Sequence, residues 1–119
     1  MAIKGLAYVH AEVSDLNRSK QFYGETLGWE LHTNEEDVAG FAFGSAYLVL
    51  VAGKSSGSHR SDAVYVGVEV TDVDAEYARL KRLGFDVSDL RDYPWGERKF
   101  SFRDPDGYLW SYGQIKAHH

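Results

Sequence analysis

The stretch that decides the fold runs from residue 95 to residue 110 and reads WGERKFSFRDPDGYLW. Phe100 and Phe102 alternate with polar residues, a pattern typical of a strand with one buried face. The next four residues, 104–107, read DPDG and predict a tight turn, because proline fixes φ and glycine accepts a positive φ. Residues 108–112 are rich in aromatic side chains and predict a returning strand. The stretch is therefore expected to form a β-hairpin.

Composition limits what the chain does. Its 119 residues are the length of one domain. It has no cysteine, which excludes disulfides, thiolate metal sites and cysteine nucleophiles. A net charge of −5 argues against a nucleic-acid-binding protein, which normally has a basic face. No apolar run is long enough to span a membrane, and no signal region follows Met1. We therefore expect a cytoplasmic protein with neither nucleic acid nor a membrane as partner.

The chain contains an internal repeat. Residues 13–16, VSDL, correspond to residues 70–73, VTDV, and the pair Leu-Gly that ends each predicted helix occurs in both halves. Each half predicts a strand, a helix and three further strands. The expected elements are strands at 6–13, 29–33, 40–44 and 47–52 with a helix at 17–27, then strands at 63–70, 85–87, 99–103 and 108–112 with a helix at 74–83.

These elements predict one domain over residues 1–119, with module one at about 1–54, a polar connector at 53–62 and module two at about 63–115. His59 lies in the connector and is interpreted as a solvated loop residue. His118 and His119 are interpreted as the remnant of an expression tag.

One helix per module covers only one side of its strands. The other side is predicted to carry Tyr8, His10 and Glu12 from the first strand, with Tyr65 and Glu69 from its counterpart in the second module. Such a side must curve inward, pair with a second chain, or do both. A polar concave face built by two repeats is a natural small-molecule site.

The order of these motifs resembles that of the vicinal oxygen chelate superfamily, over about residues 5–114. The matching motifs are DLNRSKQFY at 15–23, LG at 27–28 and DPDG at 104–107. The superfamily includes glyoxalase I, extradiol dioxygenases, fosfomycin-modifying enzymes and bleomycin-resistance proteins. The resemblance implies an α+β fold, in which two tandem βαβββ modules form a cupped mixed β-sheet with helices on its outer side. It also implies a homodimer.

The resemblance also locates the metal site of the enzymatic members, which hold a divalent ion with His or Glu side chains. By position these ligands fall on Tyr8, Leu50, Tyr65 and Ser111 of this chain. A leucine cannot bind a metal, and a serine or a neutral tyrosine is a poor ligand for a first-row divalent ion. We therefore expect no metal and no other cofactor.

Among the members, the local match is to metal-free bleomycin-resistance proteins, through WG at 95–96, Arg98, Phe100 and RDP at 103–105. The resemblance implies sequestration of a small aromatic molecule that can be cationic, such as a bleomycin-type antibiotic. Aromatic rings would stack on the ligand and carboxylates would offset its positive charge. The predicted ligand-binding residues are Tyr8, His10, Glu12, Tyr47, Tyr65, Glu69, Trp95 and Trp110.

Two alternatives stay open. The first is a glyoxalase-like lyase or a dioxygenase with a relocated site around His10, Glu12 and Glu69, in which His10 and Glu12 are the candidate catalytic residues. The second is that His10 and Glu12 form a polar pair in a dimer interface. Separately, Arg98 and Arg103 are predicted to make structural ion pairs with an acid such as Asp104 or Asp106.

Overall fold

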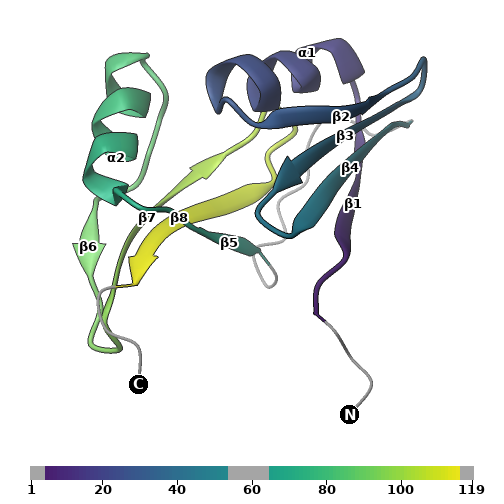
Figure 1. The fold of residues 1–119 in the computed structure, drawn as a ribbon. Helices are drawn as coiled ribbons and strands as arrows, with labels where there is room; N and C mark the ends of the chain where they lie inside the picture. The colour runs from purple at the N-terminus through teal and green to yellow at the C-terminus, as the bar shows by residue number, and fades with distance from the viewer. Residues whose placement is uncertain (1–4, 54–64, 116–119) are drawn as a thin grey trace. The chain divides into compact units, whose positions relative to one another are not determined.

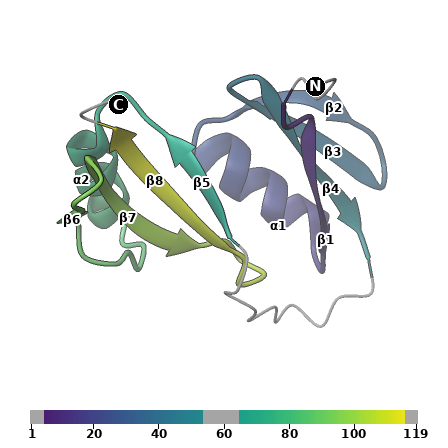
Figure 2. The ribbon, with the colours of Figure 1, turned by 90° about the horizontal axis from the view of Figure 1, so that it is seen from below.

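The structure is a computed structural model that describes residues 5–53 and 65–115. The chain divides into two compact units, unit 1 at residues 1–59 and unit 2 at residues 60–119. Each unit contains one four-stranded mixed sheet and a helical segment (Figures 1 and 2). The α+β class with two βαβββ modules is therefore confirmed. Most of the predicted connector, with His59, lies outside the described residues, as do His118 and His119.

Unit 1 follows the predicted order of elements. They are β1 (Tyr8–Val13), α1 (Leu16–Lys20), η1 (Gln21–Thr26), β2 (Glu30–Asn34), β3 (Val38–Phe43) and β4 (Ala46–Ala52). The strands are arranged β1-β4-β3-β2, with β1 parallel to β4 and the other pairs antiparallel. Asp15 caps α1, because its Oδ1 accepts from Arg18 N at 3.1 Å.

The predicted helix at 17–27 changes form halfway. It begins as α1 and continues as the π-helical segment η1, in which Leu27 N donates to Phe22 O at 2.9 Å. Phe22 and Leu27 are five residues apart, and both are buried together with Tyr23. A π-helical turn brings residues five apart onto one face, so this segment can direct all three side chains into the core. In an α-helix, residues five apart lie on different faces, so the α-helical period did not predict the π-helical segment.

Unit 2 repeats the plan. Its elements are β5 (Val66–Glu69), α2 (Val73–Arg82), β6 (Arg91–Asp92), β7 (Glu97–Arg103) and β8 (Leu109–Ile115). The strands are arranged β5-β8-β7-β6, with β5 parallel to β8 and the other pairs antiparallel. Asp72 caps α2 by accepting from Ala75 N at 3.1 Å, and Gly84 follows the helix with φ +88°. The helix predicted at 74–83 is confirmed to within one residue.

The hairpin of β7 and β8 forms the core of unit 2. Phe100 and Phe102 are 1% and 4% exposed, and both rings lie edge-on to Tyr112 of β8. Tyr77 of α2 packs against Phe100, with ring centroids 5.4 Å apart. The apolar face of the predicted strand is therefore the face that α2 covers.

The prediction of a short strand at 85–87 is wrong. Val87 makes one isolated bridge to Phe102, and the edge strand is instead β6, which pairs with Arg98 and Lys99 of β7. Ser88 replaces regular pairing, since its hydroxyl accepts from Ser101 N at 2.7 Å. A two-residue strand has no sequence period, so the pattern could not locate β6.

The turn between β7 and β8 is held by Asp104. Its Oδ1 accepts from Asp106 N at 3.0 Å and from Tyr108 N at 2.8 Å, and the side chain is buried. Gly107 has φ +91° and donates its N–H to Asp104 O at 2.9 Å. The predicted DPDG turn is confirmed, with the aspartate as its acceptor.

We predict that Asp104→Ala lowers the free energy of unfolding by about 1–2 kcal/mol, because two backbone donors lose their acceptor. Urea titration followed by circular dichroism measures this change. Asp89→Ala is the matched control, since the Asp89 carboxylate is 80% exposed and makes only a surface pair with Arg91. Equal midpoints for the two variants would contradict the role given to Asp104.

Candidate functional site

Each sheet has one side that its helix covers and an opposite side, which we call the open face. In unit 1, the even-numbered residues of β1 lie beside the odd-numbered residues of β4, since Tyr8 pairs with Tyr47 and His10 with Val49. Leu48 and Leu50 point the other way and are fully buried beneath α1. The structure thus brings Tyr8, His10, Glu12 and Tyr47 onto one open face, four of the predicted ligand-binding residues.

This face of unit 1 carries two exposed aromatic rings. Tyr8 is 60% exposed and Tyr47 is 42% exposed. His32 of β2 meets Tyr47 edge-on, with ring centroids 5.4 Å apart, and its Nε2 lies 3.6 Å from Glu30 Oε2. His32 was not among the predicted binding residues, although it lies in the strand predicted at 29–33 and strand alternation could have identified it.

Glu12 lies at the end of the same face. Its carboxylate lies so close to Gly53 that a Cβ at that position would collide with it. His10 and Glu12 are two residues apart on one strand, a separation of about 6–7 Å along the backbone. Glu69, the third member of the alternative catalytic set, belongs to unit 2. The relocated catalytic site therefore stays a prediction.

In unit 2, the open face holds a set of five side chains centred on the ammonium group of one of them, Lys99. We call it the Lys99 cluster, and its members are Tyr65, Tyr93, Trp95, Glu97 and Lys99. Lys99 Nζ donates to Tyr65 Oη at 3.1 Å and lies 5.1 Å from the centroid of the Tyr93 ring. Glu97 Oε1 lies 3.9 Å from the same Nζ.

Trp95 lies in a tight turn between Tyr93 and Gly96. Gly96 N donates to Tyr93 O at 3.1 Å, and Gly96 has φ +91°. The indole stacks on Tyr93 with ring centroids 4.8 Å apart, and its Nε1 donates to Glu97 Oε1 at 3.0 Å. Trp95 is nevertheless 59% exposed. One large ring is therefore held in place while most of its surface stays open to solvent.

The contacts of Lys99 keep its ammonium group charged. The hydrogen bond from Lys99 to the Tyr65 hydroxyl raises the pKa of Lys99 above its usual value, and the nearby Glu97 carboxylate acts in the same direction. Desolvation opposes the shift without reversing it. Lys99 is therefore a cation throughout the neutral pH range.

Trp110 is the predicted binding residue that the structure contradicts. It pairs with Phe102 across the hairpin and with Val66 of β5, and it is 3% exposed. These neighbours place it on the side that α2 covers, together with Tyr112. The four-residue turn fixes this register, so alternation turns Trp110 into the core.

The remaining predicted residues of unit 2 lie on its open face. Tyr65 is 44% exposed, and Glu69 pairs with Gly113 of β8. On β7, Lys99 pairs with Gly113 from the other side, so a glycine separates the two charged residues. Tyr93, Glu97 and Lys99 were not among the predicted binding residues. Lys99 precedes the buried Phe100 in the same strand, so alternation alone would have placed it on the open face.

The family model described as the glyoxalase/bleomycin resistance protein/dioxygenase superfamily matches residues 5–112. This chain belongs to that superfamily. No curated protein matches the chain significantly. Among solved structures, TnmS3, an antibiotic binding protein from Streptomyces sp. CB03234, is 30% identical, with a TM-score of 0.78 and coverage of 97% of this chain and 98% of that one.

Two other superfamily structures share the fold at lower identity. Lactoylglutathione lyase from Agrobacterium tumefaciens is 21% identical, with a TM-score of 0.79 and coverage of 98% of this chain and 97% of that one. The fosfomycin resistance protein FosX from Listeria monocytogenes is 23% identical, with a TM-score of 0.79 and coverage of 94% and 93%. These two likenesses support the fold alone.

The residues at the superfamily's metal positions do not fit a divalent ion. Tyr8 and Tyr65 lie on the open faces, but Leu50 is fully buried on the helix side, so the assignment of a metal-ligand position to Leu50 is wrong. The open-face residues beside it are Val49 and Val51. Within either unit, the described residues contain no group of three His, Asp or Glu side chains able to hold a metal.

The arginines of β7 have structural partners. Arg98 lies on the helix side and donates to Asp74 of α2 at 3.0 Å and to Asp92 of β6 at 3.0 Å. The hydrogen bond to Asp74 raises the pKa of Arg98. Its structural role is as predicted, but the predicted acid partners, Asp104 and Asp106, are wrong. Arg103 donates to Gly107 O at 2.9 Å and so holds the hairpin turn.

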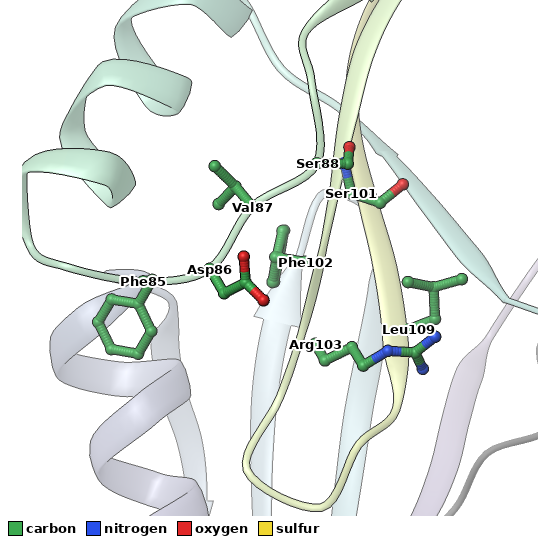
Figure 3. Close-up of a pocket in the computed structure, with 8 residues that line it drawn as sticks. All are labelled: Phe85, Asp86, Val87, Ser88, Ser101, Phe102, Arg103 and Leu109. Carbon is green, nitrogen blue, oxygen red and sulfur yellow. The ribbon is translucent and has the colours of Figure 1, made fainter.

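A pocket of about 430 Å³ lies at the hairpin end of unit 2 (Figure 3). Side chains reach it from two sides, the segment before β6 and the hairpin. They are Phe85, Asp86, Val87 and Ser88 on one side and Ser101, Phe102, Arg103 and Leu109 on the other. Ser101 and Arg103 continue the open face of β7 beyond Lys99. None of the predicted binding residues lines this pocket, and none lines a second hollow of about 640 Å³ in unit 1, between the α1–η1 segment and β2–β3.

Proposed function

We propose that this protein binds a small planar aromatic molecule, such as an aromatic antibiotic, and sequesters it without a metal and without changing its bonds. The observation that carries the proposal is the Lys99 cluster, in which Trp95 is fixed by Tyr93 and Glu97 and yet stays exposed. A ring that is already ordered loses little conformational entropy on binding, so stacking on it is favourable.

Two further observations support the proposal. The open face of unit 1 adds exposed phenol rings at Tyr8 and Tyr47, so both units carry surfaces suited to stacking. TnmS3, which is described as antibiotic-binding, is 30% identical over nearly the whole chain. The homodimer and the cytoplasmic location remain parts of this proposal. Among the described residues, no helix is long and apolar enough to cross a membrane.

Calorimetric titration tests the proposal. The purified chain is titrated with a panel of bleomycin-type and other aromatic antibiotics, before and after dialysis against EDTA. We expect binding of at least one member with the same dissociation constant in both preparations, because no metal takes part. Mass spectrometry should recover that ligand unchanged.

Two outcomes would overturn the proposal. One is a folded protein that binds no member of the panel. The other is conversion of a bound ligand, or a loss of binding with EDTA together with a stoichiometric divalent ion in the purified protein. The second outcome would favour the lyase or dioxygenase alternative around His10 and Glu12. Sedimentation velocity on the same sample tests the homodimer.

A further inference from the structure

Lys99 has hydrogen-bonding capacity that the described residues do not use. An ammonium group has three N–H donors. Among residues 5–53 and 65–115, Tyr65 Oη at 3.1 Å is the acceptor that Nζ reaches within hydrogen-bond distance, since Glu97 Oε1 lies at 3.9 Å. The side chain is 16% exposed, so the charge is partly removed from water. A partly desolvated cation with spare donors favours an additional acceptor.

The position of this ammonium is defined by several contacts. Its Nζ lies 5.1 Å from the Tyr93 ring and 5.5 Å from the Tyr65 ring, and both phenol rings attract a cation. Tyr93 in turn stacks on Trp95. Glu97 Oε1 also links the two groups, since it lies 3.9 Å from Nζ and accepts from the indole Nε1 at 3.0 Å. A planar ligand that overlaps the Nε1 edge of the indole would therefore come near the ammonium.

Lys99 has no β8 side chain beside it. Its neighbour on β8 is Gly113, which has no side chain, and the next residue in the row is Glu69 of β5. A Cβ at Gly113 would lie 2.5 Å from Glu97 Oε2, so this glycine also makes room for the carboxylate that holds Trp95. The glycine thus leaves room for the carboxylate that anchors the indole.

We infer that Lys99 selects, among planar aromatic ligands, those that carry an anionic oxygen such as a carboxylate or a phenolate. The inference rests on the proposed function and names the ligand class for the open face of unit 2. A charge-assisted hydrogen bond to Nζ is stronger than a neutral one. A cationic ligand would instead meet a like charge at Nζ. Of the two carboxylates on this face, Glu97 already accepts from the Trp95 indole and lies 3.9 Å from Nζ, and Glu69 lies beyond Gly113. The contacts that raise the pKa of Lys99 support this, because they keep the donor charged.

The experiment uses three probes that share one naphthalene ring. They are 2-naphthoate, the neutral 2-naphthalenemethanol and the cationic 2-naphthylmethylammonium, each titrated into the full chain by calorimetry at pH 7. We expect the wild type to bind 2-naphthoate most tightly. Lys99→Met should weaken that binding roughly tenfold, the effect of one hydrogen bond to a charged group. Binding of the neutral probe should change less than about twofold.

Two further variants show whether the effect comes from the positive charge at this position. Lys81→Met is the matched control, because Lys81 also lies over a tyrosine ring, at 5.5 Å from the centroid of Tyr77, but on the exposed surface of α2. It removes the same charge and should leave all three affinities unchanged. Lys99→Arg retains the cation and should retain the preference for 2-naphthoate. Thermal unfolding establishes that each variant is folded.

The outcomes separate this inference from the proposed function. If the probes bind but Lys99→Met and Lys81→Met have equal effects on 2-naphthoate, the inference is overturned and the proposed function stands. The same holds if antibiotics of the panel bind and no naphthalene probe does. If neither the panel nor the probes bind the folded protein, both are overturned.

Discussion

Trp95→Ala should weaken binding of the aromatic ligand by roughly 30- to 100-fold, a loss of about 2–3 kcal/mol. The indole is the largest exposed ring of unit 2, and it is ordered before the ligand arrives by its stack on Tyr93 and its bond to Glu97. Removing it eliminates both the stacking surface and the ordering. Calorimetry with the antibiotic that binds wild type most tightly measures the change.

Trp95→Phe is the control that separates the two contributions. Phenylalanine keeps an aromatic ring but has no N–H for Glu97, so the ring remains and its anchor is lost. We expect a loss of about threefold for this variant, the value of one modest hydrogen bond. Both variants should unfold within about 0.5 kcal/mol of wild type, since a side chain that is 59% exposed contributes little to the core. Wild-type affinity in Trp95→Ala would contradict the placement of the ligand.

The parts of the fold that were predicted are those with local causes. The DPDG turn depends on residues within four positions of one another, so the sequence alone specified it. The η1 segment and the two-residue β6 were missed because their spacing matches no regular period. Trp110 was assigned to the wrong side, although the register across the known turn was sufficient to place it beside Phe102.

The candidate site was predicted only in part, for a different physical reason. Strand alternation identified Tyr8, His10, Glu12 and Tyr65 as open-face residues. The Lys99 cluster needed more, because the bond from Lys99 to Tyr65 joins residues 34 positions apart. That contact depends on the order β5-β8-β7, in which β8 lies between β7 and the strand that follows Tyr65. This order does not follow from the spacing of residues along one strand.

Phe100→Ala should lower the free energy of unfolding by about 3–5 kcal/mol, the cost of a cavity in a well-packed aromatic core. Phe100 is 1% exposed and contacts Tyr77, Phe102 and Tyr112. Urea titration measures the change. Phe85→Ala is the matched control in the same unit, because Phe85 is 38% exposed and should cost no more than about 1 kcal/mol.

Phe100→Ala also tests whether the two faces of β7 contribute separately to stability and to ligand binding. Phe100 and Lys99 are adjacent in the chain, but their side chains point to opposite faces of the sheet. Phe100→Ala should therefore bind ligand as wild type does at temperatures where it is fully folded, while Lys99→Met should lose affinity at nearly wild-type stability. If Phe100→Ala lost binding in proportion to its stability, the open face would depend on the core packing. Ligand binding on one face of β7 would then not be independent of core packing on the other face.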